Sequence, residues 1–251
     1  KLAQNGVYLG PLRLLALEVY ERMKDAQIPC TMLTGEERIY EENSRITSST
    51  VEMLDLDQKY DVAVIDEAQM IADSDRGHSW TRAILGTQAD EIHVCMSPSA
   101  EKVVTHLISL CGDTFETHRY ERKTQLLCEE EPFSFPEDVR EGDALIVFTK
   151  RMVLDIAARL ERRGLQVSVI YGSLPPEIRR RQIRIFSEGK TQIVVSTDAI
   201  GMGLNLPVRR IVFVHTEKFD GKHTRPLNTA EIHQIAGRAG RFGLYDTGYV
   251  N

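Results

Sequence analysis

The chain has 251 residues, 42% hydrophobic and 27% charged, which is typical of an ordinary globular protein. No apolar run approaches the roughly 18 residues of a membrane span, and no signal-peptide pattern opens the chain. The four cysteines lie far apart without a Cys-x-x-Cys pair, which argues against a zinc site or a disulfide framework and favours an intracellular protein with reduced thiols.

The net charge of −6 hides two halves of opposite sign. Residues 1–140 hold 14 Lys and Arg against 26 Asp and Glu, a balance of −12, whereas residues 141–251 hold 17 against 11, a balance of +6. Such asymmetry hints at a polyanionic partner. Two solvated surfaces of different composition would explain it equally well.

Apolar stretches in the first half alternate between strand and helical spacing. We predict, in chain order, a strand at 6–10, a helix with Leu12, Leu15, Ala16, Val19, Tyr20 and Met23 in phase, strands at 30–35, 45–50 and 60–66, a helix at 79–86, a strand at 92–96 and a helix at 99–110.

The alternation of strands and helices is interrupted in the middle of the chain and resumes in the second half. The stretch "EEEPFSFPEDVREGD" (129–143) has two prolines, many acids and no periodicity, and we interpret it as part of a linker. After it we predict strands at 144–149, 167–172, 192–197 and 210–215, with helices around Val153–Leu160, at 176–188 and from Thr229.

This order predicts an α/β fold of two domains, each a largely parallel sheet flanked by helices. We expect the first domain at residues 1–122, a linker at 123–142 and the second domain at 143–251.

Ligands of open parallel sheets bind at the carboxyl ends of the strands, so residues that follow the strands are candidates. In "YDVAVIDEAQM" (60–70) a buried strand ends in Asp66 and Glu67, a costly arrangement unless a metal or a reaction uses them. A strand that simply reaches the surface is about as good an explanation of these two acids alone.

Two further stretches carry a candidate phosphate site. "TDAIGMGLN" (197–205) leaves the backbone amides at Gly201 and Gly203 free to approach a ligand. "QIAGRAGR" (234–241) sets Arg238 and Arg241 one helical turn apart, where two guanidinium groups suit phosphate oxygens.

These stretches together resemble a known family. "VIDEAQ" (64–69), "STDAIGMGLNL" (196–206), "QIAGRAGR" and "GPLRLLA" (10–16) resemble, in order and spacing, motifs of superfamily-two helicases, whose core has two RecA-like domains. "GVYLGPLRLLALE", "TGEER" and "VIYGSLPP" resemble the DExH RNA helicases of the mitochondrial RNA degradosome and their bacterial relatives. One such motif is weak evidence, but five in order are strong.

The resemblance implies the chemistry of the candidate residues, with ATP and Mg²⁺ as cofactors. Asp66 would hold Mg²⁺ and Glu67 would activate the attacking water. The remaining implied roles are charge neutralisation on the transferred phosphoryl group by Gln234, Arg238 and Arg241, nucleotide contacts by Asp198, Gly201 and Gly203, and coupling to the nucleic-acid surface by Gln69, Ser97 and Ser99.

RNA is the implied partner, bound mostly by its backbone. The matching positions are Pro11, Arg13, Thr34, Gly35, Thr50, Lys150, Tyr171, Gly172, Ser173 and Thr197. Because amides, hydroxyls and helix N-termini supply such contacts, a protein of net negative charge can still bind RNA.

The chain departs from the family in one respect. No Gly-x-x-x-x-Gly-Lys-Ser/Thr phosphate loop occurs; "EGKTQ" (188–192) is rejected because Arg184 replaces the first glycine and the stretch precedes a strand. We therefore expect a fragment of the family, with the first domain truncated at its N-terminus and inactive alone.

Other notable residues receive structural interpretations. We expect Trp80 to pack in the core of its helix rather than to stack on a base. Arg179, Arg180, Arg181 and Arg184 are interpreted as a solvated helix face, with an RNA contact as the alternative.

The sequence thus predicts the motor core of an ATP-dependent RNA helicase that translocates 3′→5′ and unwinds RNA in RNA turnover. An exoribonuclease is a candidate partner, no membrane is involved, and the location is the bacterial cytoplasm or the mitochondrial matrix of a eukaryote. The alternatives are a DNA-directed helicase of the same superfamily and a non-enzymatic nucleic-acid-binding or scaffolding module.

Overall fold

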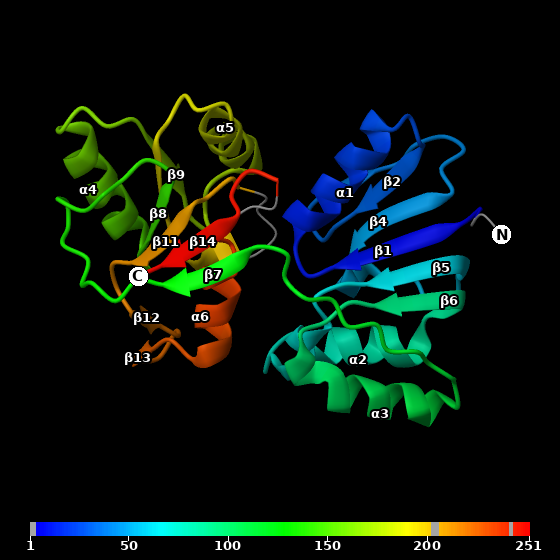
Figure 1. Ribbon diagram of the computed structural model, residues 1–251. Coiled ribbons are helices and arrows are strands. Elements are labelled where there is room, and N and C mark those ends of the chain that lie inside the picture. The colour runs from blue at the N-terminus through cyan, green and yellow to red at the C-terminus, as the bar shows by residue number, and fades with distance from the viewer. Residues whose placement is uncertain (1–3, 202–205, 241–242) are drawn as a thin grey trace. The chain divides into compact units, whose positions relative to one another are not determined.

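The chain forms two compact units, Lys1–Arg119 (unit 1) and Tyr120–Asn251 (unit 2), in a computed structural model (Figure 1). The structure describes residues 4–201, 206–240 and 243–251. Within these residues no helix is both long and apolar enough to cross a membrane.

Unit 1 is built around one six-stranded sheet. Its elements are β1 (Gly6–Gly10), α1 (Arg13–Asp25), β2 (Cys30–Leu33), β3 (Arg38–Ile39), β4 (Ile46–Thr50), the 3-10 helix η1 (Val51–Met53), β5 (Lys59–Ile65), η2 (Ala68–Ala72), α2 (Gly77–Gly86), β6 (Gln88–Val94), η3 (Pro98–Ala100) and α3 (Glu101–Cys111). The strand order is β3-β2-β4-β1-β5-β6, and only β3 pairs antiparallel. The predicted parallel sheet of the first domain is confirmed.

The strand β1 lies at the centre of this sheet and shows how its two faces are used. Val7 and Leu9 point to the side of α2 and α3, where they pack in a buried cluster with Trp80 and Val104. Tyr8 points to the opposite side, because side chains alternate along a strand. That opposite side carries α1, which packs beside β2 and β4 (Figure 1).

Unit 2 repeats the same architecture with a different strand order. Its elements are β7 (Gln125–Cys128), β8 (Asp143–Ile146), α4 (Lys150–Glu161), β9 (Val167–Ile170), α5 (Pro176–Ser187), β10 (Ile193–Ser196), η4 (Asp198–Gly201), β11 (Arg210–Phe213), β12 (Glu217–Phe219), β13 (Thr224–Pro226), α6 (Thr229–Ala236) and β14 (Thr247–Val250). The main sheet has the order β7-β14-β11-β8-β10-β9 and is parallel throughout.

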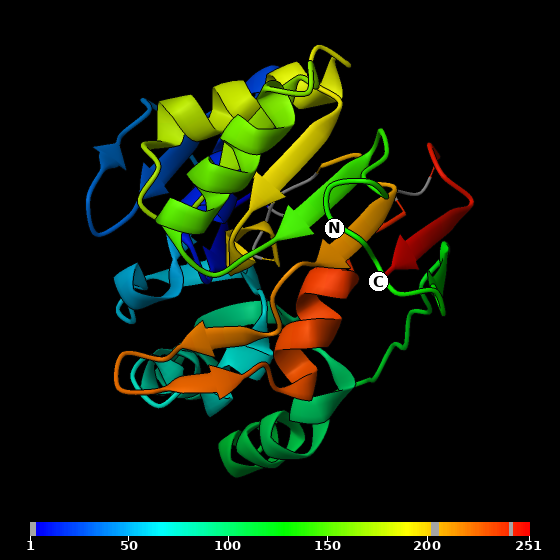
Figure 2. The same cartoon turned by 90° about the vertical axis from the view of Figure 1, so that its left-hand side faces the viewer.

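The centre of the unit 2 sheet is buried on both faces. Every residue of β8 and β10 is buried, as expected for parallel strands that helices cover from two sides. Figure 2 shows α4 and α5 (green to yellow) on one side of the strands and α6 (orange) on the other. The helix α4 begins where the hydroxyl of Thr149 accepts a hydrogen bond from the N–H of Met152 at 3.1 Å.

The predicted linker at residues 123–142 differs from the structure. Part of it, β7, forms the edge strand beside β14, and Phe133 and Phe135 pack against the buried cluster of unit 2. The sequence shows no periodicity here because β7 is short and exposed along its length. The segment is therefore a structural part of unit 2.

The sequence also does not predict four short strands: β3, β12, β13 and β14. Each has two to four residues, too few for a period of two to be distinguished from a loop. The hairpin of β12 and β13 lies beside α6 in both views (Figures 1 and 2).

A buried ion pair ties the amino ends of β8 and β11 together. Arg210 donates to both carboxylate oxygens of Asp143, at 2.9 and 2.6 Å, and the two residues are 4% and 1% exposed. Arg210 also donates to Glu129 Oε2 and to the carbonyl of Asp138, both at 2.7 Å. Burial alone would lower the pKa of Arg210, but the bonds to Asp143 and Glu129 raise it overall.

We expect Asp143→Ala to lower the free energy of unfolding of unit 2 by about 3–5 kcal/mol, because it leaves a buried guanidinium without its main partner. Glu137→Ala is the matched control: its ion pair with Arg163 is 3.1 Å long, but the side chains are 59% and 51% exposed, and the expected loss is below about 1 kcal/mol. Urea unfolding measures both. Equal losses would contradict the structural importance of the Arg210–Asp143 pair.

Candidate functional site

The predicted site residues of unit 1 gather at one edge of its sheet. The neighbouring strands β4, β1 and β5 end at Thr50, Gly10 and Ile65, and all three run in the same direction. Asp66 and Glu67 follow β5 directly. The structure therefore brings the two acids to the same edge as the predicted nucleic-acid positions after β1 and β4.

Asp66 is held by hydrogen bonds from three groups. The hydroxyl of Tyr8 donates to Oδ2 at 2.7 Å, and the backbone N–H of Glu67 donates to Oδ1 at 2.9 Å. Nε1 of Trp80, a fully buried residue, donates to the carbonyl of Asp66 at 2.9 Å. Burial and the bond to Asp66 raise the pKa of Tyr8, so its hydroxyl remains a donor. The predicted core position of Trp80 is confirmed.

Glu67 occupies an unusual backbone conformation. Its φ of 51° and ψ of 42° lie in the left-handed region, which costs a residue with a side chain about 1 kcal/mol or more. Glycine would avoid that cost. A glutamate at this position is therefore a reason to assign its carboxylate a function.

A hydrogen-bonded chain, here called the 67–99 network, leads away from this carboxylate. Nε2 of Gln69 donates to Oε2 of Glu67, and Oε1 of Gln69 accepts from the N–H of Ser97 at 3.1 Å. The hydroxyls of Ser97 and Ser99 are 2.7 Å apart. The residues predicted to couple the two sites are thus physically connected within unit 1.

The two acids suit a divalent cation that arrives with its own ligands. Among the described residues no group of three or more His, Cys, Asp or Glu side chains could hold a metal. Mg²⁺ commonly binds through one or two carboxylates together with substrate phosphates. The oriented carboxylate of Asp66 fits that arrangement.

The predicted nucleic-acid position Pro11 is fixed by an arginine that the sequence analysis missed. Nη2 of Arg76 donates to the carbonyl of Pro11 at 2.6 Å and to Glu52 at 2.7 Å. The same guanidinium lies 5.5 Å from the ring centroid of Trp80. Nothing in the sequence around Arg76 signals this contact, because its partners are far away along the chain.

Arg13 lies within the predicted nucleic-acid surface but is engaged in ion pairs. It donates to Glu36 at 2.5 Å and to Glu37 at 2.6 Å, and its side chain is 27% exposed. These pairs join the start of α1 to the turn that contains Gly35. A phosphate at this position would have to compete with two carboxylates.

Thr34 and Thr50 are almost completely buried, at 2% and 8% exposure. The hydroxyl of Thr34 donates to the carbonyl of Glu37 and accepts from its N–H, both at 3.0 Å. The hydroxyl of Thr34 is thus engaged in shaping its own turn. Any nucleic-acid contact at this position would come from the backbone.

In unit 2 the predicted nucleic-acid residues after β8 and β9 lie close together. Nζ of Lys150 is 5.3 Å from the ring centroid of Tyr171, a cation–π contact. Gly172 and Ser173 are exposed beside them. Lysine and a glycine-containing turn thus form one surface at the carboxyl edge of the sheet.

Arg179 is not part of a solvated helix face, contrary to the sequence analysis. Its Nη2 donates to the carbonyl of Gly172 at 2.6 Å and to those of Tyr171 and Leu174 at 3.3 Å. Burial lowers the pKa of Arg179. The arginine therefore holds the turn that carries the predicted nucleic-acid residues.

The motifs around Gly201 and Arg238 are packed directly on each other. Arg238 donates to the carbonyl of Gly201 from Nε at 3.0 Å and from Nη2 at 2.6 Å. A Cβ at Gly201 would lie 3.3 Å from Ile235 and 3.6 Å from Gln234, so glycine permits α6 to approach. The predicted residues Thr197, which is 7% exposed, and Asp198 stand at the other end of η4.

Lys218, on the unpredicted hairpin, links η4 to α6. Its Nζ lies 3.2 Å from Asp198 and 2.6 Å from Glu231, and Glu231 also accepts two bonds of 2.9 Å from Arg225. Glu231 closes a capping box with Asn228 at the start of α6. The hydrogen bonds from Arg225 outweigh burial and, with those from Lys218, lower the pKa of Glu231 to about 2.

Two predicted site residues, Gly203 and Arg241, lie outside the described residues. Their expected roles remain sequence-based.

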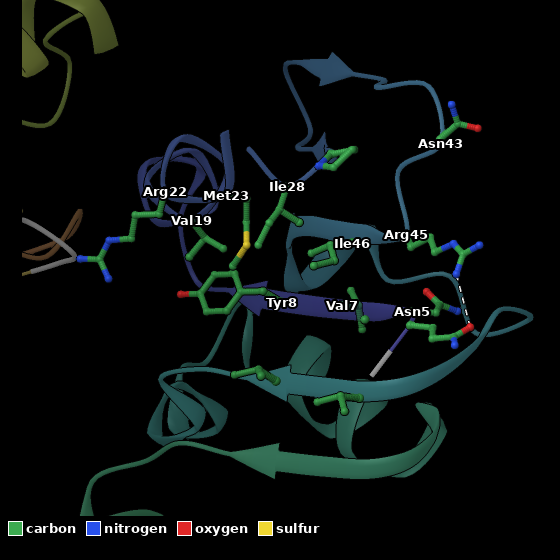
Figure 3. Close-up of a pocket in the computed structure, with 15 residues that line it drawn as sticks. Asn5, Val7, Tyr8, Val19, Arg22, Met23, Ile28, Asn43, Arg45 and Ile46 are labelled. Carbon is green, nitrogen blue, oxygen red and sulfur yellow. Dashed lines mark hydrogen bonds between the residues drawn. The ribbon is translucent and has the colours of Figure 1, made fainter. Parts of the chain in front are cut away.

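A pocket of ≈ 750 Å³ opens on the α1 side of the unit 1 sheet (Figure 3). Tyr8, Val19, Met23 and Ile28 line it with largely apolar groups. No predicted site residue is among the described residues that line this pocket. Its connection to the candidate site is the ring of Tyr8, whose hydroxyl reaches Asp66.

The two units match two different protein families. Residues 1–120 match the family described as the DEXQ-box helicase domain of Suv3, and residues 122–243 match the helicase conserved C-terminal domain. The sequence Asp-Glu-Ala-Gln at 66–69 agrees with the first description.

Curated relatives show similarity along nearly the whole chain. ATP-dependent RNA helicase SUV3, mitochondrial, of Saccharomyces cerevisiae is 44% identical over 249 residues, covering 96% of this chain and 34% of the relative. DExH-box ATP-dependent RNA helicase DExH16, mitochondrial, of Arabidopsis thaliana is 44% identical over 243 residues, covering 96% of this chain and 43% of the relative. The chain thus spans about a third of the length of the yeast relative.

Solved structures confirm the predicted fold class. The S. cerevisiae protein described as Dbp5 L327V bound to RNA and ADP BeF3 superposes with a TM-score of 0.68 at 18% identity, covering 99% of this chain and 71% of that chain. At this identity the likeness concerns the fold alone, an α/β arrangement of two RecA-like parallel sheets.

We expect Glu231→Gln to reduce stability most at neutral pH. A carboxyl whose pKa falls from 4.5 to about 2 on folding stabilises the folded chain above pH ~4.5, and this contribution disappears as the pH falls toward ~2. The difference from wild type should be at most about 3 kcal/mol at pH 7 and should shrink in acid. Thermal unfolding between pH 2 and 7 measures it. Glu217→Gln, at an exposed position of β12, is the control, and a pH-independent difference for Glu231→Gln would contradict the assignment.

Proposed function

The chain belongs to the helicases that combine a Suv3-type DEXQ-box domain with a helicase C-terminal domain, and on this premise we propose that the full-length protein is an ATP-dependent RNA helicase. Its two RecA-like units would form the motor core. The 67–99 network carries this proposal, because it joins the carboxylate of Glu67, a residue with a strained backbone, to the residues predicted to couple the nucleotide and RNA sites.

In the proposed reaction the residues of unit 1 organise ATP hydrolysis. The residues fit Mg²⁺ bound together with ATP, and the cation would neutralise charge on the β- and γ-phosphates. Asp66 would hold the cation, with its carboxylate oriented by Tyr8 and the N–H of Glu67. Glu67 would orient the attacking water and accept its proton.

Residues of unit 2 would also act on the nucleotide. Arg238 and Arg241 would neutralise charge that develops on the transferred phosphoryl group, an effect worth roughly 10³–10⁵ in rate for an arginine finger. Gln234 would stand beside them. Asp198, Gly201 and Gly203 would contact the nucleotide through the η4 motif.

RNA would bind along the carboxyl edges, mainly through its phosphates and sugars. Arg76 and Arg179 support this by holding the carbonyl groups of the Pro11 and Gly172 segments in place. Since Thr34, Thr50 and Thr197 are buried, we assign their contacts to backbone groups. Hydrogen bonds from a fixed backbone to phosphate carry no base preference.

The finer biological role follows the relatives that are named mitochondrial RNA helicases. We propose 3′→5′ translocation in RNA turnover, with an exoribonuclease as a candidate partner and the mitochondrial matrix as the location in a eukaryotic cell. A DNA-directed helicase is the second candidate, because backbone contacts alone discriminate weakly between the two nucleic acids.

Glu67→Gln in the full-length protein should abolish RNA-stimulated ATP hydrolysis while ATP still binds. The amide keeps the shape of the side chain but cannot accept a proton, so turnover should fall by at least about 10²-fold. Phosphate release and the binding of a fluorescent ATP analogue are the measurements.

The exposed Glu42→Gln is the control for loss of one charge in unit 1. If Glu67→Gln hydrolyses ATP at the wild-type rate, the proposed catalytic role is wrong. If the wild-type protein hydrolyses no ATP in the presence of RNA, the proposed function itself fails.

Single-stranded RNA should bind more tightly than DNA of the same sequence and should show little base preference. Contacts to phosphates and 2′-hydroxyls predict an affinity that falls steeply as salt rises. Fluorescence anisotropy with matched RNA and DNA oligonucleotides at several salt concentrations measures this. Equal affinity and equal ATPase stimulation by DNA would favour the DNA-directed alternative.

A further inference from the structure

The chain leaves α6 through a loop whose carbonyl groups accept no helical hydrogen bond from the residues that the structure describes. In this 237–240 loop the N–H of Arg238 donates to Ile235 at 3.0 Å and that of Ala239 to Ala236 at 3.0 Å. Gly240 then turns with a φ of +70°. The last carbonyls of a helix need other donors.

Arg122 supplies these donors from the segment that precedes β7. Its Nη1 donates to the carbonyl of Gly237 at 3.0 Å, and its Nη2 donates to that of Ala239 and lies 3.4 Å from that of Gly240. Nε donates to the carbonyl of Thr124 at 2.8 Å, which fixes the guanidinium on its own segment. Among the described residues every hydrogen-bond partner given for Arg122 is a backbone carbonyl.

Close packing holds the same three segments together around this guanidinium. A Cβ at Gly240 would lie 2.6 Å from the N of Gly248 and 2.6 Å from Cγ2 of Thr124. A Cβ at Gly248 would lie 2.6 Å from the carbonyl of Ala239. Thr124 is only 4% exposed. The loop, β14 and the segment before β7 therefore have little freedom to move independently.

The loop contains Arg238, whose side chain reaches Gly201. The position of its Cα depends on the loop carbonyls on either side, Gly237 and Ala239, and Arg122 binds both. The residue Arg122 is also only three positions after Arg119, where the chain passes from unit 1 to unit 2.

We propose that Arg122 is a positioning residue for the arginine-bearing loop: it ties the segment that enters unit 2 to the backbone on both sides of Arg238. The catalytic consequence rests on the proposed function, in which Arg238 and Arg241 act on the transferred phosphoryl group. The physical link between Arg122 and the loop does not depend on that function.

Hydrogen exchange tests the physical link in the full-length protein. In Arg122→Ala the amides of residues 238–240 should exchange at least about tenfold faster than in wild type, because their carbonyl neighbours lose their donors. The amides of α4 are the internal reference for intact folding. Arg119→Ala is the matched control: it removes the same charge three residues earlier, at a side chain that is 80% exposed and pairs with Glu101.

ATP hydrolysis tests the consequence. Arg122→Ala should lower kcat of RNA-stimulated hydrolysis by about 10- to 100-fold, the effect of misplacing a catalytic group, while KM for ATP and RNA affinity stay within about threefold. Arg122→Lys should give an intermediate loss, since a point charge cannot bind two carbonyls as the planar fork does. If Arg122 acts through Arg238, the double variant Arg122→Ala with Arg238→Ala should be no slower than Arg238→Ala alone.

The outcomes separate the two proposals. Unchanged exchange at 238–240 in Arg122→Ala overturns the positioning role, whatever the activity. Faster exchange with an unchanged kcat overturns its catalytic consequence. If the wild-type protein shows no RNA-stimulated ATP hydrolysis, the proposed function fails. Hydrogen exchange alone then tests the link between Arg122 and the 237–240 loop. If the α4 amides of Arg122→Ala lose their protection from hydrogen exchange, that variant is not correctly folded. The hydrogen exchange at 238–240 and the kcat of Arg122→Lys then test the positioning role instead.

Discussion

Parallel pairing of the central strands determines where the candidate groups that follow these strands stand. In unit 1, β1 lies between β4 and β5, and in unit 2, β8 lies between β10 and β11, all in parallel register. Such strands must end at one common edge, and the chain must leave that edge through loops. Asp66 and Glu67 thus come to stand beside segments that are far away in the sequence.

Loops around the two sheets create a second requirement, because their backbone carbonyls lack the partners that strands and helices supply. Arginine meets it repeatedly here: Arg76 binds the carbonyl of Pro11, Arg179 those around Gly172, Arg122 those of the 237–240 loop and Arg238 that of Gly201. The planar guanidinium carries five donors, so one side chain can fix several carbonyls. Arginines near a predicted phosphate site therefore also shape it.

The sequence predicts the sheets, and the position of Asp66 and Glu67 at the end of a strand, for a local reason. A buried strand that ends in two acids is visible within eleven residues, as in "YDVAVIDEAQM". The roles of Arg122 and Arg179 are not visible, because their partners are carbonyl groups, which every residue has. The strand β7, inside the expected linker, is not visible in the sequence for a related reason. It is exposed, and only its pairing with β14 makes it a strand.

Each unit connects its predicted nucleotide residues internally to residues with another predicted role, coupling in unit 1 and RNA binding in unit 2. In unit 1 the 67–99 network makes the connection through hydrogen bonds between side chains and one backbone amide. In unit 2, Thr197 and Asp198 are neighbours on one turn, which Lys218 and Arg238 fasten to α6 at its two ends. A ligand that displaces η4 must therefore also strain the contacts of α6. Such connections allow a change at the predicted nucleotide residues to be transmitted within a single unit.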